Sequence, residues 1–309
     1  MSDLSAKHFH DEDAARAFLE AIRWPSGRVC AHCGEIGKAY ETDRPGVYRC
    51  ASKECRKDFT VTVGTLMERS HIPVSKWLMA THLLMASKKG ISAHQMSRML
   101  SVSYKSGWFL MHRIREALRE GKFLAPLGGE GKTVEIDETF VGGKERNKHR
   151  SKRKHKGTGG VGKEAVFSLL EREGKVRSHH VPAVNAKTLR PIINAQVDAA
   201  TLVMTDEGAT AKALGREFDR HEMVNHSIGE YVRGGTHTNT IEGYFSILKR
   251  GINGVYHHVS QKHLKRYLGE FDFRYNERSA LGVSDTERMV KALKGIEGKR
   301  LTYGGSQAR

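Results

Sequence analysis

The sequence predicts a multidomain protein of mixed α+β and α/β class, in which a small cysteine-containing ribbon and a helical bundle precede a larger domain built on a mixed sheet. Three observations predict this class. All four cysteines lie between residues 30 and 55. Apolar residues recur at helical spacing from 73 to 119, and strand-like runs alternate with helical ones from Thr133 onward. A chain of 309 residues is long enough to bury the cores of about two or three domains.

Positive charge is in large excess. The chain has 52 lysines and arginines against 35 acidic residues, a formal net charge of +17. This favours an anionic polymer as partner, because basic side chains near phosphates release condensed counterions. A basic protein without such a partner is the alternative.

The start of the chain predicts where the protein acts. No apolar run approaches the length of about eighteen residues that a spanning helix needs, and the first residues lack a secretory signal pattern. We therefore expect a cytoplasmic, nucleoid-associated protein with no membrane partner and no small-molecule substrate.

Two pairs of cysteines follow a short amphipathic helix that is expected to end near Trp24. Cys30 and Cys33 form the first pair, and Cys50 and Cys55 the second. Two cysteine turns about twenty residues apart match tetrahedral thiolate coordination of a structural Zn²⁺, with a short hairpin between them. The second pair encloses four residues where two are commoner, which loosens that turn without excluding coordination.

Other interpretations of the cysteines stay open. Disulfides or inert buried thiols are the alternatives, although a reducing compartment favours metal. His32 lies inside the first turn and competes as a ligand, but four cysteines already fill a tetrahedral shell. The alternating residues 56–63 predict a strand that closes the ribbon.

Residues 73–119 predict three helices. The first begins near Ser75 and stops at Gly90, a short second helix runs from Ile91 to Leu100, and after a tight turn the third spans 104–119. This is the layout of a helix-turn-helix, whose last helix can enter the major groove of DNA. Three-helix bundles that bind nothing share the layout. The glycine-rich residues 121–131 predict a linker.

From Thr133 onward, strands alternate with helices. Strands are expected at 134–141, 165–170 and 176–181, then a helix at 186–197, a strand at 201–206, a helix at 209–219, a strand at 221–232 and a helix at 236–249. This is the order of elements in a ribonuclease-H-like core. The basic loop 144–163 is usually a solvated segment, but it also suits a phosphate backbone.

The last predicted helix presents a polar face. Asn239, Glu242, Ser246 and Lys249 follow one another at steps of three or four residues, so they lie on one side of the helix. On the other side, Ile241, Phe245 and Leu248 are expected to pack inward. An ordinary amphipathic helix with a solvated polar side has the same pattern.

Carboxylates from three elements are expected to meet beside this helix. Asp137 lies in the first strand, Asp206 at the end of the neighbouring fourth strand, and Glu242 on the helix. Converging carboxylates raise one another's pKa, and two Mg²⁺ or Mn²⁺ ions about 4 Å apart would neutralise them and support in-line displacement at a DNA phosphodiester. Glu135 shares the face of Asp137, and Glu207 adjoins Asp206, so both are alternative ligands.

These residues resemble a known family, the DDE insertion-sequence transposases of the ISXO-like branch. The resemblance runs from Trp24 to Arg278. The segments that carry it are Ile136–Thr139, Thr205–Gly208, His237–Gly243, Leu248–Gly251, Gly254–Ser260, Lys262–Leu264 and Phe273–Arg278.

The resemblance implies a zinc ribbon and a helix-turn-helix that bind terminal inverted repeats, followed by a catalytic domain that cuts and joins double-stranded DNA. It implies that Asp137, Asp206 and Glu242 bind magnesium, with Asn239 and Lys249 at the edge of the site. Members of the branch differ in the third acidic position, so the roles of Glu242 and Asn239 stay open. Pairing of two DNA ends with target DNA implies a homodimer or higher assembly.

The expected boundaries are an N-terminal helical segment at 1–26, a zinc ribbon at 27–66, a helix-turn-helix domain at 67–121, a linker at 122–132, a ribonuclease-H-like catalytic domain at 133–285 and a C-terminal tail at 286–309. Two other functions stay possible with this organisation. One is a non-catalytic DNA-binding regulator, and the other is a structure-specific nuclease of the same fold.

Overall fold

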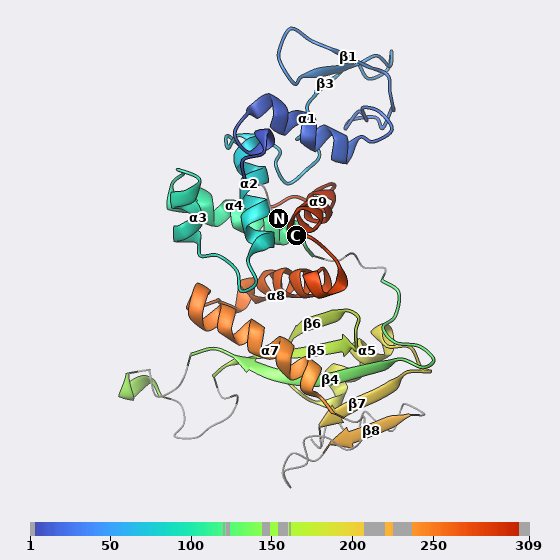
Figure 1. The fold of residues 1–309 in the computed structure, drawn as a ribbon, viewed down its shortest axis with the longest axis vertical. Coiled ribbons are helices and arrows are strands. Elements are labelled where there is room, and N and C mark those ends of the chain that lie inside the picture. Colours follow the sequence, from blue (N-terminus) through green and yellow to red (C-terminus); the bar gives the residue numbers. More distant parts are fainter. Residues whose placement is uncertain are drawn as a thin grey trace. The chain divides into compact units, whose positions relative to one another are not determined.

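A computed structural model of the chain describes residues 4–119, 121, 124–143, 149–153, 160, 162–206, 220–224 and 237–302. The chain divides into two compact units (Figure 1). Unit 1 comprises Met1–Arg119 and Glu277–Arg309, and unit 2 comprises Glu120–Asn276. In the described part of the chain, no helix has the length and apolar character needed to cross a membrane.

Unit 1 begins with a helix and a small antiparallel sheet. The elements are the short helix η1 (Lys7–Phe9), helix α1 (Glu12–Arg23) and strands β1 (Ala39–Glu41), β2 (Tyr48–Cys50) and β3 (Asp58–Phe59), paired in the order β1-β2-β3. Helix α1 ends at Arg23, and the ring of the next residue, Trp24, packs edge-on against Tyr48 and Phe59 with centroids 5.9 and 5.8 Å away. This aromatic contact supplies the apolar core of the ribbon.

The predicted strand at 56–63 is shorter in the structure. Pairing stops at Phe59, and successive turns follow, with the N–H of Val63 donating to the carbonyl of Thr60 and that of Thr65 to the carbonyl of Thr62. The hydroxyl groups of Thr60 and Thr62 hydrogen-bond to each other at 2.9 Å, which favours the turn over an extended strand.

Three helices follow as the sequence predicted. They are α2 (Val74–Ala86), α3 (Ala93–Met99) and α4 (Tyr104–Ala117). Ser92 and Ser103 cap α3 and α4 through their side chains. Helices α3 and α4 cross closely at Gly107, where an added Cβ would lie 3.1 Å from the Cβ of Ser97.

The predicted C-terminal tail is wrong as far as the structure describes it. Residues Asp285–Lys294 form helix α9, which begins with a capping box between Ser284 and Glu287 and belongs to unit 1. The buried Arg288 donates to the carbonyl oxygens of Met85 at 2.8 Å and Glu277 at 2.7 Å. The described part of the C-terminal segment completes the core of the N-terminal unit, so the expected boundary at 285 lies too late. The short helix η6 (Ser279–Leu281) precedes α9.

Unit 2 is built on a five-stranded mixed sheet in the order β6-β5-β4-β7-β8. Its strands are β4 (Thr133–Val141), β5 (Glu164–Glu171), β6 (Val176–Val181), β7 (Leu202–Asp206) and β8 (His221–Val224). Strands β4, β5 and β6 form the antiparallel meander, and β7 and β8 extend it in parallel beside β4. The predicted fold class is confirmed, and the described elements follow the predicted order.

Helices cover both faces of this sheet. On one face Val134 and Ile136 pack with Leu189 and Ile193 of α5 (Ala186–Gln196). On the other face, Val141 packs with α7 (Asn239–Gly251) and α8 (Gln261–Asn276), which are joined by a π-helical turn, Ile252–Tyr256. Alternate residues of β4 therefore face different layers, and the odd-numbered ones face α7.

Side chains of helix α8 bond to the first half of the β6 edge of the sheet. The side chain of Asn276 accepts the N–H of Val176 at 2.7 Å and donates to its carbonyl at 3.0 Å, as a neighbouring strand would. Asp272 accepts the N–H of Ser178 at 2.8 Å and the hydroxyl of Tyr244 at 2.5 Å. The outward-facing backbone groups of Val176 and the N–H of Ser178 are thus already bonded.

The predicted linker is ordered in its second half. Leu127 is buried, its N–H donates to the carbonyl of Gln196 at 2.7 Å, and its carbonyl accepts the N–H of Asp198 at 2.9 Å. The segment around Leu127 therefore belongs to unit 2. Several predictions lie outside the described residues, namely the helix at 209–219, the end of the strand at 221–232, Glu207 and much of the loop 144–163, of which η3 (Arg150–Lys152) is described.

Candidate metal centre and acidic site

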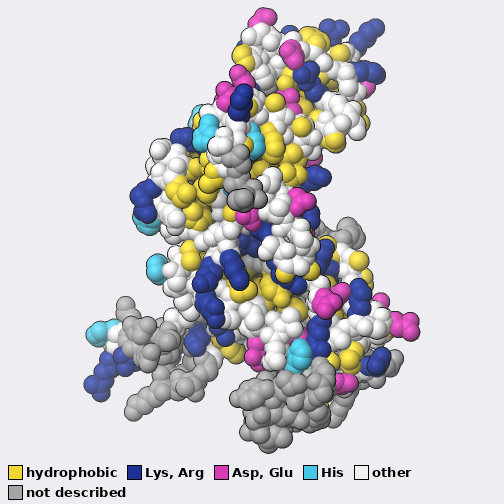
Figure 2. All heavy atoms as spheres, in the orientation of Figure 1, with side chains coloured by type: hydrophobic (Ala, Val, Ile, Leu, Met, Phe, Trp, Pro, Cys, Tyr) yellow, Lys and Arg dark blue, Asp and Glu magenta, His cyan; other side chains and the backbone are white. Residues whose placement is uncertain are grey.

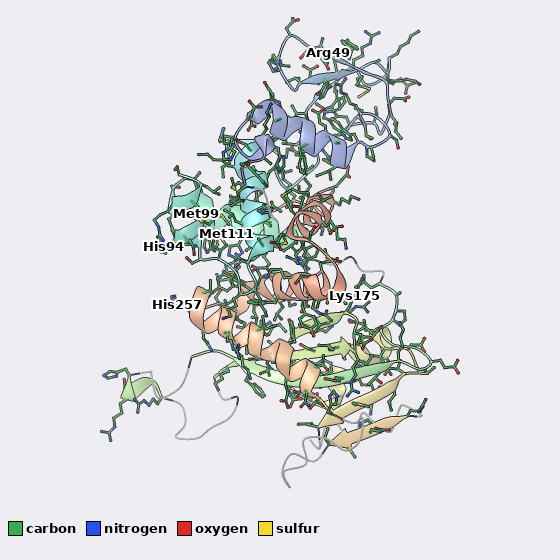
Figure 3. The ribbon with its side chains drawn as sticks, viewed as in Figure 1. Arg49, His94, Met99, Met111, Lys175 and His257 are labelled. Atoms are coloured by element: carbon green, nitrogen blue, oxygen red, sulfur yellow. The ribbon has the colours of Figure 1, made fainter. Side chains whose placement is uncertain are left out.

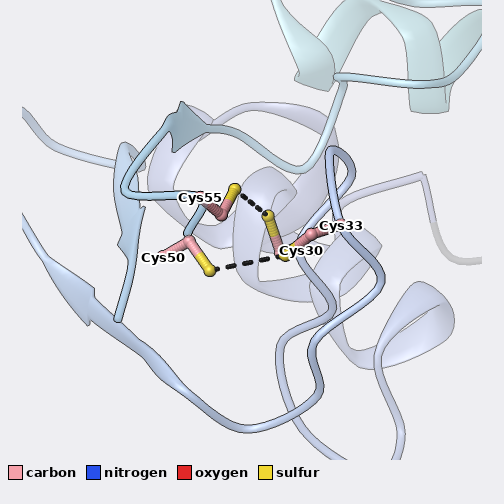
Figure 4. A group of neighbouring side chains, drawn as sticks. All are labelled: Cys30, Cys33, Cys50 and Cys55. Carbon is pink, nitrogen blue, oxygen red and sulfur yellow. Dashed lines mark hydrogen bonds between the residues drawn. The ribbon is translucent and has the colours of Figure 1, made fainter. Parts of the chain in front are cut away.

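The four cysteines of unit 1 form a compact group. Cys30 and Cys33 come from the turn before β1, Cys50 ends β2, and Cys55 lies in the turn before β3. Their sulfur atoms all lie within 4.8 Å of one another. Figure 4 shows Cys30 facing Cys55 at 3.8 Å and Cys33 facing Cys50 at 3.7 Å between sulfur atoms.

These distances fit a tetrahedral zinc site. Sulfur atoms bound at about 2.3 Å to one Zn²⁺ lie about 3.8 Å apart along the edges of the tetrahedron, whereas a disulfide would bring two of them to about 2.05 Å. The ring of His32 instead contacts the carbonyl of Asp58 at 3.1 Å, outside the sulfur group. The cysteines are therefore the ligand set, and the alternatives of disulfides and of His32 as a ligand are not supported.

The electrostatics of the group also favour a bound cation. The N–H of Glu35 favours the Cys33 thiolate, but burial and the three neighbouring thiols outweigh it and raise the pKa of Cys33 to about 12. Thiolates so close together repel one another, and a divalent ion removes that penalty. The site is a structural zinc site.

In unit 2, Asp137 and Asp206 occupy equivalent places on adjacent parallel strands. The last paired residues of β4 and β7 are Glu135 and Met204, and each aspartate lies two residues further along its strand. Side chains two positions apart on a strand point to the same face of the sheet. Both aspartates therefore project towards the face of the sheet that α7 covers, at the point where pairing of β4 with β7 ends.

Helix α7 presents the polar face that the sequence predicted. Ile241, Phe245 and Leu248 are buried against the sheet. On the other side Asn239, Glu242 and Lys249 are exposed and Ser246 is half-buried. Glu242 lies in the first turn, while Lys249 follows it by about two turns, or about 10 Å along the axis.

The acids of the two strands and the helix influence one another electrostatically. Burial raises the pKa of Asp137 to about 7 despite the N–H of Glu138, which its Oδ1 accepts at 2.7 Å. The charges of Glu138, Asp206 and Glu242 raise this pKa further. Burial and the charge of Asp206 also raise the pKa of Glu138. Glu138, whose side chain alternation assigns to the other face, therefore belongs to the same group of charges.

These acids do not form a closed ligand set by themselves. Among the described residues, only the cysteines bring three or more ligand atoms close enough to hold one ion. Carboxylate oxygens are nevertheless the donors that Mg²⁺ prefers, and Mg²⁺ commonly takes one or two carboxylates and completes its shell with water and phosphate oxygens. The acidic group thus fits divalent ions that are shared with a phosphate.

Alternation along β4 left Glu135 open as an alternative metal ligand, but in the structure its carboxylate binds the start of α7 instead. Its carboxylate is fully buried and accepts the N–H of Ile241 at 2.9 Å and the hydroxyl of Thr240 at 2.9 Å. Arg172 donates to the same carboxylate at 2.7 Å and to the carbonyl of His237 at 2.7 Å. We call Glu135, Arg172, Thr240 and Ile241 the α7 anchor.

The α7 anchor explains how helix and sheet keep their relative position. The first N–H groups of a helix have no partner within it, and an acid at that end also complements the helix dipole. Thr238, the residue before α7, makes no side-chain cap. Glu135 supplies the missing acceptor from the neighbouring strand, so it fixes the start of the helix that carries Glu242.

The exposed residues around α3 and α4 form the surface expected of the helix-turn-helix. The rings of His94 and Tyr104 stack at 4.2 Å, and Tyr104 and Met99 are exposed although they are large and apolar. Figure 3 labels His94 and Met99 on α3 and Met111 on α4; the first two are exposed, whereas Met111 is buried. Lys105 follows Tyr104 in the first turn of α4 and is exposed.

Known proteins match both units. Residues 126–276 match the ISXO2-like transposase domain, and residues 10–58 match the transposase zinc-ribbon domain. The chain is 31% identical over 284 residues to an uncharacterized protein in transposable element ISH50 of Halobacterium salinarum, which covers 87% of this chain and 92% of that protein. It is 28% identical over 118 residues to an uncharacterized transposase-like protein of Haemophilus influenzae, covering 38% of this chain and 94% of that protein.

The first domain match falls within unit 2, and the second includes all four cysteines of the zinc site. The similarity to the ISH50 protein extends over most of both chains. The chain therefore belongs to the ISXO2-like transposase family and carries that family's zinc ribbon at its N-terminal end.

Proposed function

We propose that this transposase binds the terminal inverted repeats of its element and catalyses both DNA strand cleavage and strand transfer at the acidic site of unit 2. The observation that carries the proposal is the equivalent placement of Asp137 and Asp206 on neighbouring strands, on the side covered by the helix of Glu242. The proposed ligands of divalent metal are these three acids.

Divalent Mg²⁺ or Mn²⁺ at this site would activate the attacking oxygen and stabilise the leaving oxygen of an in-line displacement. The residues of the chain prepare that reaction. Asp137 must lose its proton to bind a cation, and its raised pKa places this step near neutral pH. Asn239 and Lys249, on the exposed face of α7, are proposed to orient the DNA strand at the edge of the site.

Atoms balance without a covalent protein intermediate. In cleavage, a water oxygen bonds to phosphorus as the bond to the 3′ oxygen breaks, which frees a 3′ hydroxyl. In transfer, that hydroxyl attacks a phosphodiester of the target, so one bond forms for each one broken. No serine, cysteine or tyrosine nucleophile and no energy-rich cofactor is needed. Joining two ends to one target also favours a homodimer or larger assembly.

The DNA-binding parts are proposed to be the zinc ribbon and the helix pair α3–α4 of unit 1. The exposed Tyr104 and Lys105 open α4, the helix that would enter the major groove in this arrangement. Sequence reading would then belong to unit 1, and chemistry to unit 2.

The test uses the purified protein, labelled duplexes taken from both flanks of its gene, and Mg²⁺. Joined products are expected from the native chain, and Asp206→Asn should bind the same duplexes without cutting them. Asp198→Asn is the matched control, because Asp198 is an exposed acid in the turn before β7. Cutting without joining would indicate a nuclease, and binding alone a regulator. Unchanged cleavage by Asp206→Asn would remove that residue from the site.

A further inference from the structure

The corner between α7 and α8 carries more positive charge than Lys249, the one cation there that the proposed chemistry uses. Between Glu242 and Glu270 the chain contains no aspartate or glutamate. Six basic or histidine residues in this stretch are exposed: Lys249, Arg250, His257, His258, Lys262 and Lys265. We call these six the basic corner. Figure 2 shows lysine and arginine side chains gathered on this part of unit 2, and Figure 3 labels His257 at the corner.

In the described part of the chain, the lysines and arginine of the corner have no acidic partner. Elsewhere in unit 2, Lys132 pairs with Glu171 at 3.0 Å. Within the described residues, none of the ion pairs involves Lys249, Arg250, Lys262 or Lys265. Clustered like charges repel one another, so a surface of this kind favours a polyanion.

The corner is also held in a defined shape. Its turn is π-helical, a form that is rare and often occurs at functional sites. The hydroxyl of Tyr256 donates to the buried carboxylate of Glu270 at 2.6 Å, which ties the turn to α8. The next residue, His257, has a φ of 58°, an uncommon value for a residue other than glycine. A strained exposed residue next to a turn that is tied to a buried acid is a feature found at binding sites.

The position of the corner relates it to the acids. Helix α7 carries Glu242 in its first turn and ends at Gly251, so the turn of the corner begins about 14 Å further along the helix axis. A duplex that follows the helix would cover this length with about four base pairs. Lys249 and Arg250, in the last turn of α7, are the members of the corner that lie nearest to Glu242 along the helix.

We propose that the basic corner binds the phosphate backbone of double-stranded DNA about four or more base pairs from the scissile phosphate. The distance to the scissile phosphate rests on the proposed function, whereas the binding of DNA by the corner does not. The occupant is duplex DNA because the charges are spread over two helices and a rigid turn. Contacts from these side chains to DNA phosphates would contribute affinity and positioning rather than sequence reading.

The test compares the full-length, zinc-loaded protein with Lys262→Ala/Lys265→Ala, which leaves the proposed catalytic residues intact. The probe is a random-sequence 30-base-pair duplex, without added Mg²⁺, and the measurement is the slope of log K against log salt. Each lost phosphate contact should reduce this slope by about 0.9. Lys175→Ala/Lys187→Ala is the matched control, since both lysines are exposed in unit 2 outside the corner.

A slope lowered by about 1–2 in the corner variant alone supports the proposal. An unchanged slope, or a loss confined to single-stranded DNA of the same sequence, overturns it. A second arm measures cleavage of duplexes that end about two or about ten base pairs from the cut. The native chain should cleave the longer duplex better than the shorter one, and the corner variant should cleave both at the rate of the shorter one. If the native chain cuts nothing, the proposed function fails while the salt slope still tests the corner.

Discussion

The carboxylate of Glu135 accepts the backbone N–H of Ile241 at 2.9 Å, although the two residues lie 106 positions apart in the chain. One acid of β4 thereby fixes the first turn of α7. Asp137 lies two residues further along the same face of β4, and Glu242 follows Ile241 directly. The same hydrogen bond therefore relates two of the three proposed metal ligands to each other.

Replacing Glu135 should loosen this relation. In Glu135→Ala the N–H of Ile241 and the guanidinium of Arg172 lose a buried acceptor, which should lower the stability of unit 2 by about 3–5 kcal/mol. Glu135→Gln keeps an acceptor oxygen and should cost less. All three tryptophans lie in unit 1, so urea unfolding followed by far-UV circular dichroism should shift while the tryptophan transition stays in place. A shift in both would argue against a local role.

Metal binding should depend on pH through Asp137. Its pKa rises from 3.8 to about 7 in the folded protein. Between these values the folded state holds a proton that the unfolded chain has released, so this group's contribution to stability falls as pH rises from about 4 to 7. Mg²⁺ should restore that stability at about pH 8 and have little effect at about pH 6. Thermal unfolding measures this, and Asp137→Asn should remove both the pH trend and the Mg²⁺ response.

Glu242 is expected to matter more than Asn239 as the third ligand. The charge of Glu242 contributes to the raised pKa of Asp137, which places the two carboxyl groups within electrostatic reach. Loss of a metal-binding charge in Glu242→Gln should reduce cleavage by about 100-fold or more, and Asn239→Ala by about 10-fold or less. Ser246→Ala, one turn further along the same face, is the control. Equal losses for Glu242 and Asn239 would contradict this assignment.

Zinc should be required for the ribbon to fold. Cys33→Ser should release the ion and unfold the segment that packs on Trp24, because structural zinc contributes about 10–16 kcal/mol in small zinc domains. Zinc content and the tryptophan signal report the two effects. His32→Ala should retain zinc, since the ring of His32 contacts the carbonyl of Asp58 instead.

Helix α9 should stabilise unit 1. Arg288→Ala leaves the carbonyls of Met85 and Glu277 without their donor and should lower the stability of unit 1 by about 2–4 kcal/mol. The tryptophan transition in urea reports this loss. Lys294→Ala, an exposed change on the same helix, should leave the transition unchanged.

Local patterns predicted much of this structure. The spacing of apolar residues placed α2, α3, α4 and α7 within a few residues of their bounds, because one face of each is buried. The spacing of the cysteines predicted the zinc site, since each pair forms a tight turn. Alternation in β4 correctly placed Glu135 and Asp137 on one face.

Partners distant in sequence could not be predicted in this way. Alternation identifies the face of Glu135 but not the helix that covers it, so the hydrogen bond to Ile241 was missed. Helix α9 did have a readable signal, the capping box from Ser284 to Glu287. Its partner, however, is α2, where the carbonyl of Met85 accepts from Arg288 across 203 positions of the chain. The effect of Glu138 on the pKa of Asp137 was missed, because charges act through space on both faces of a strand.

The side chains bonded along the first half of the β6 edge limit how copies of this protein can associate. Open sheet edges invite strand addition by another molecule and are a common origin of fibrillar aggregates. Here the carboxamide of Asn276 and the carboxylate of Asp272 occupy the positions where an incoming strand would bond. In the homodimer or larger assembly proposed above, copies of the chain would therefore not be expected to pair through this part of β6, so the backbone there is protected from unwanted strand addition.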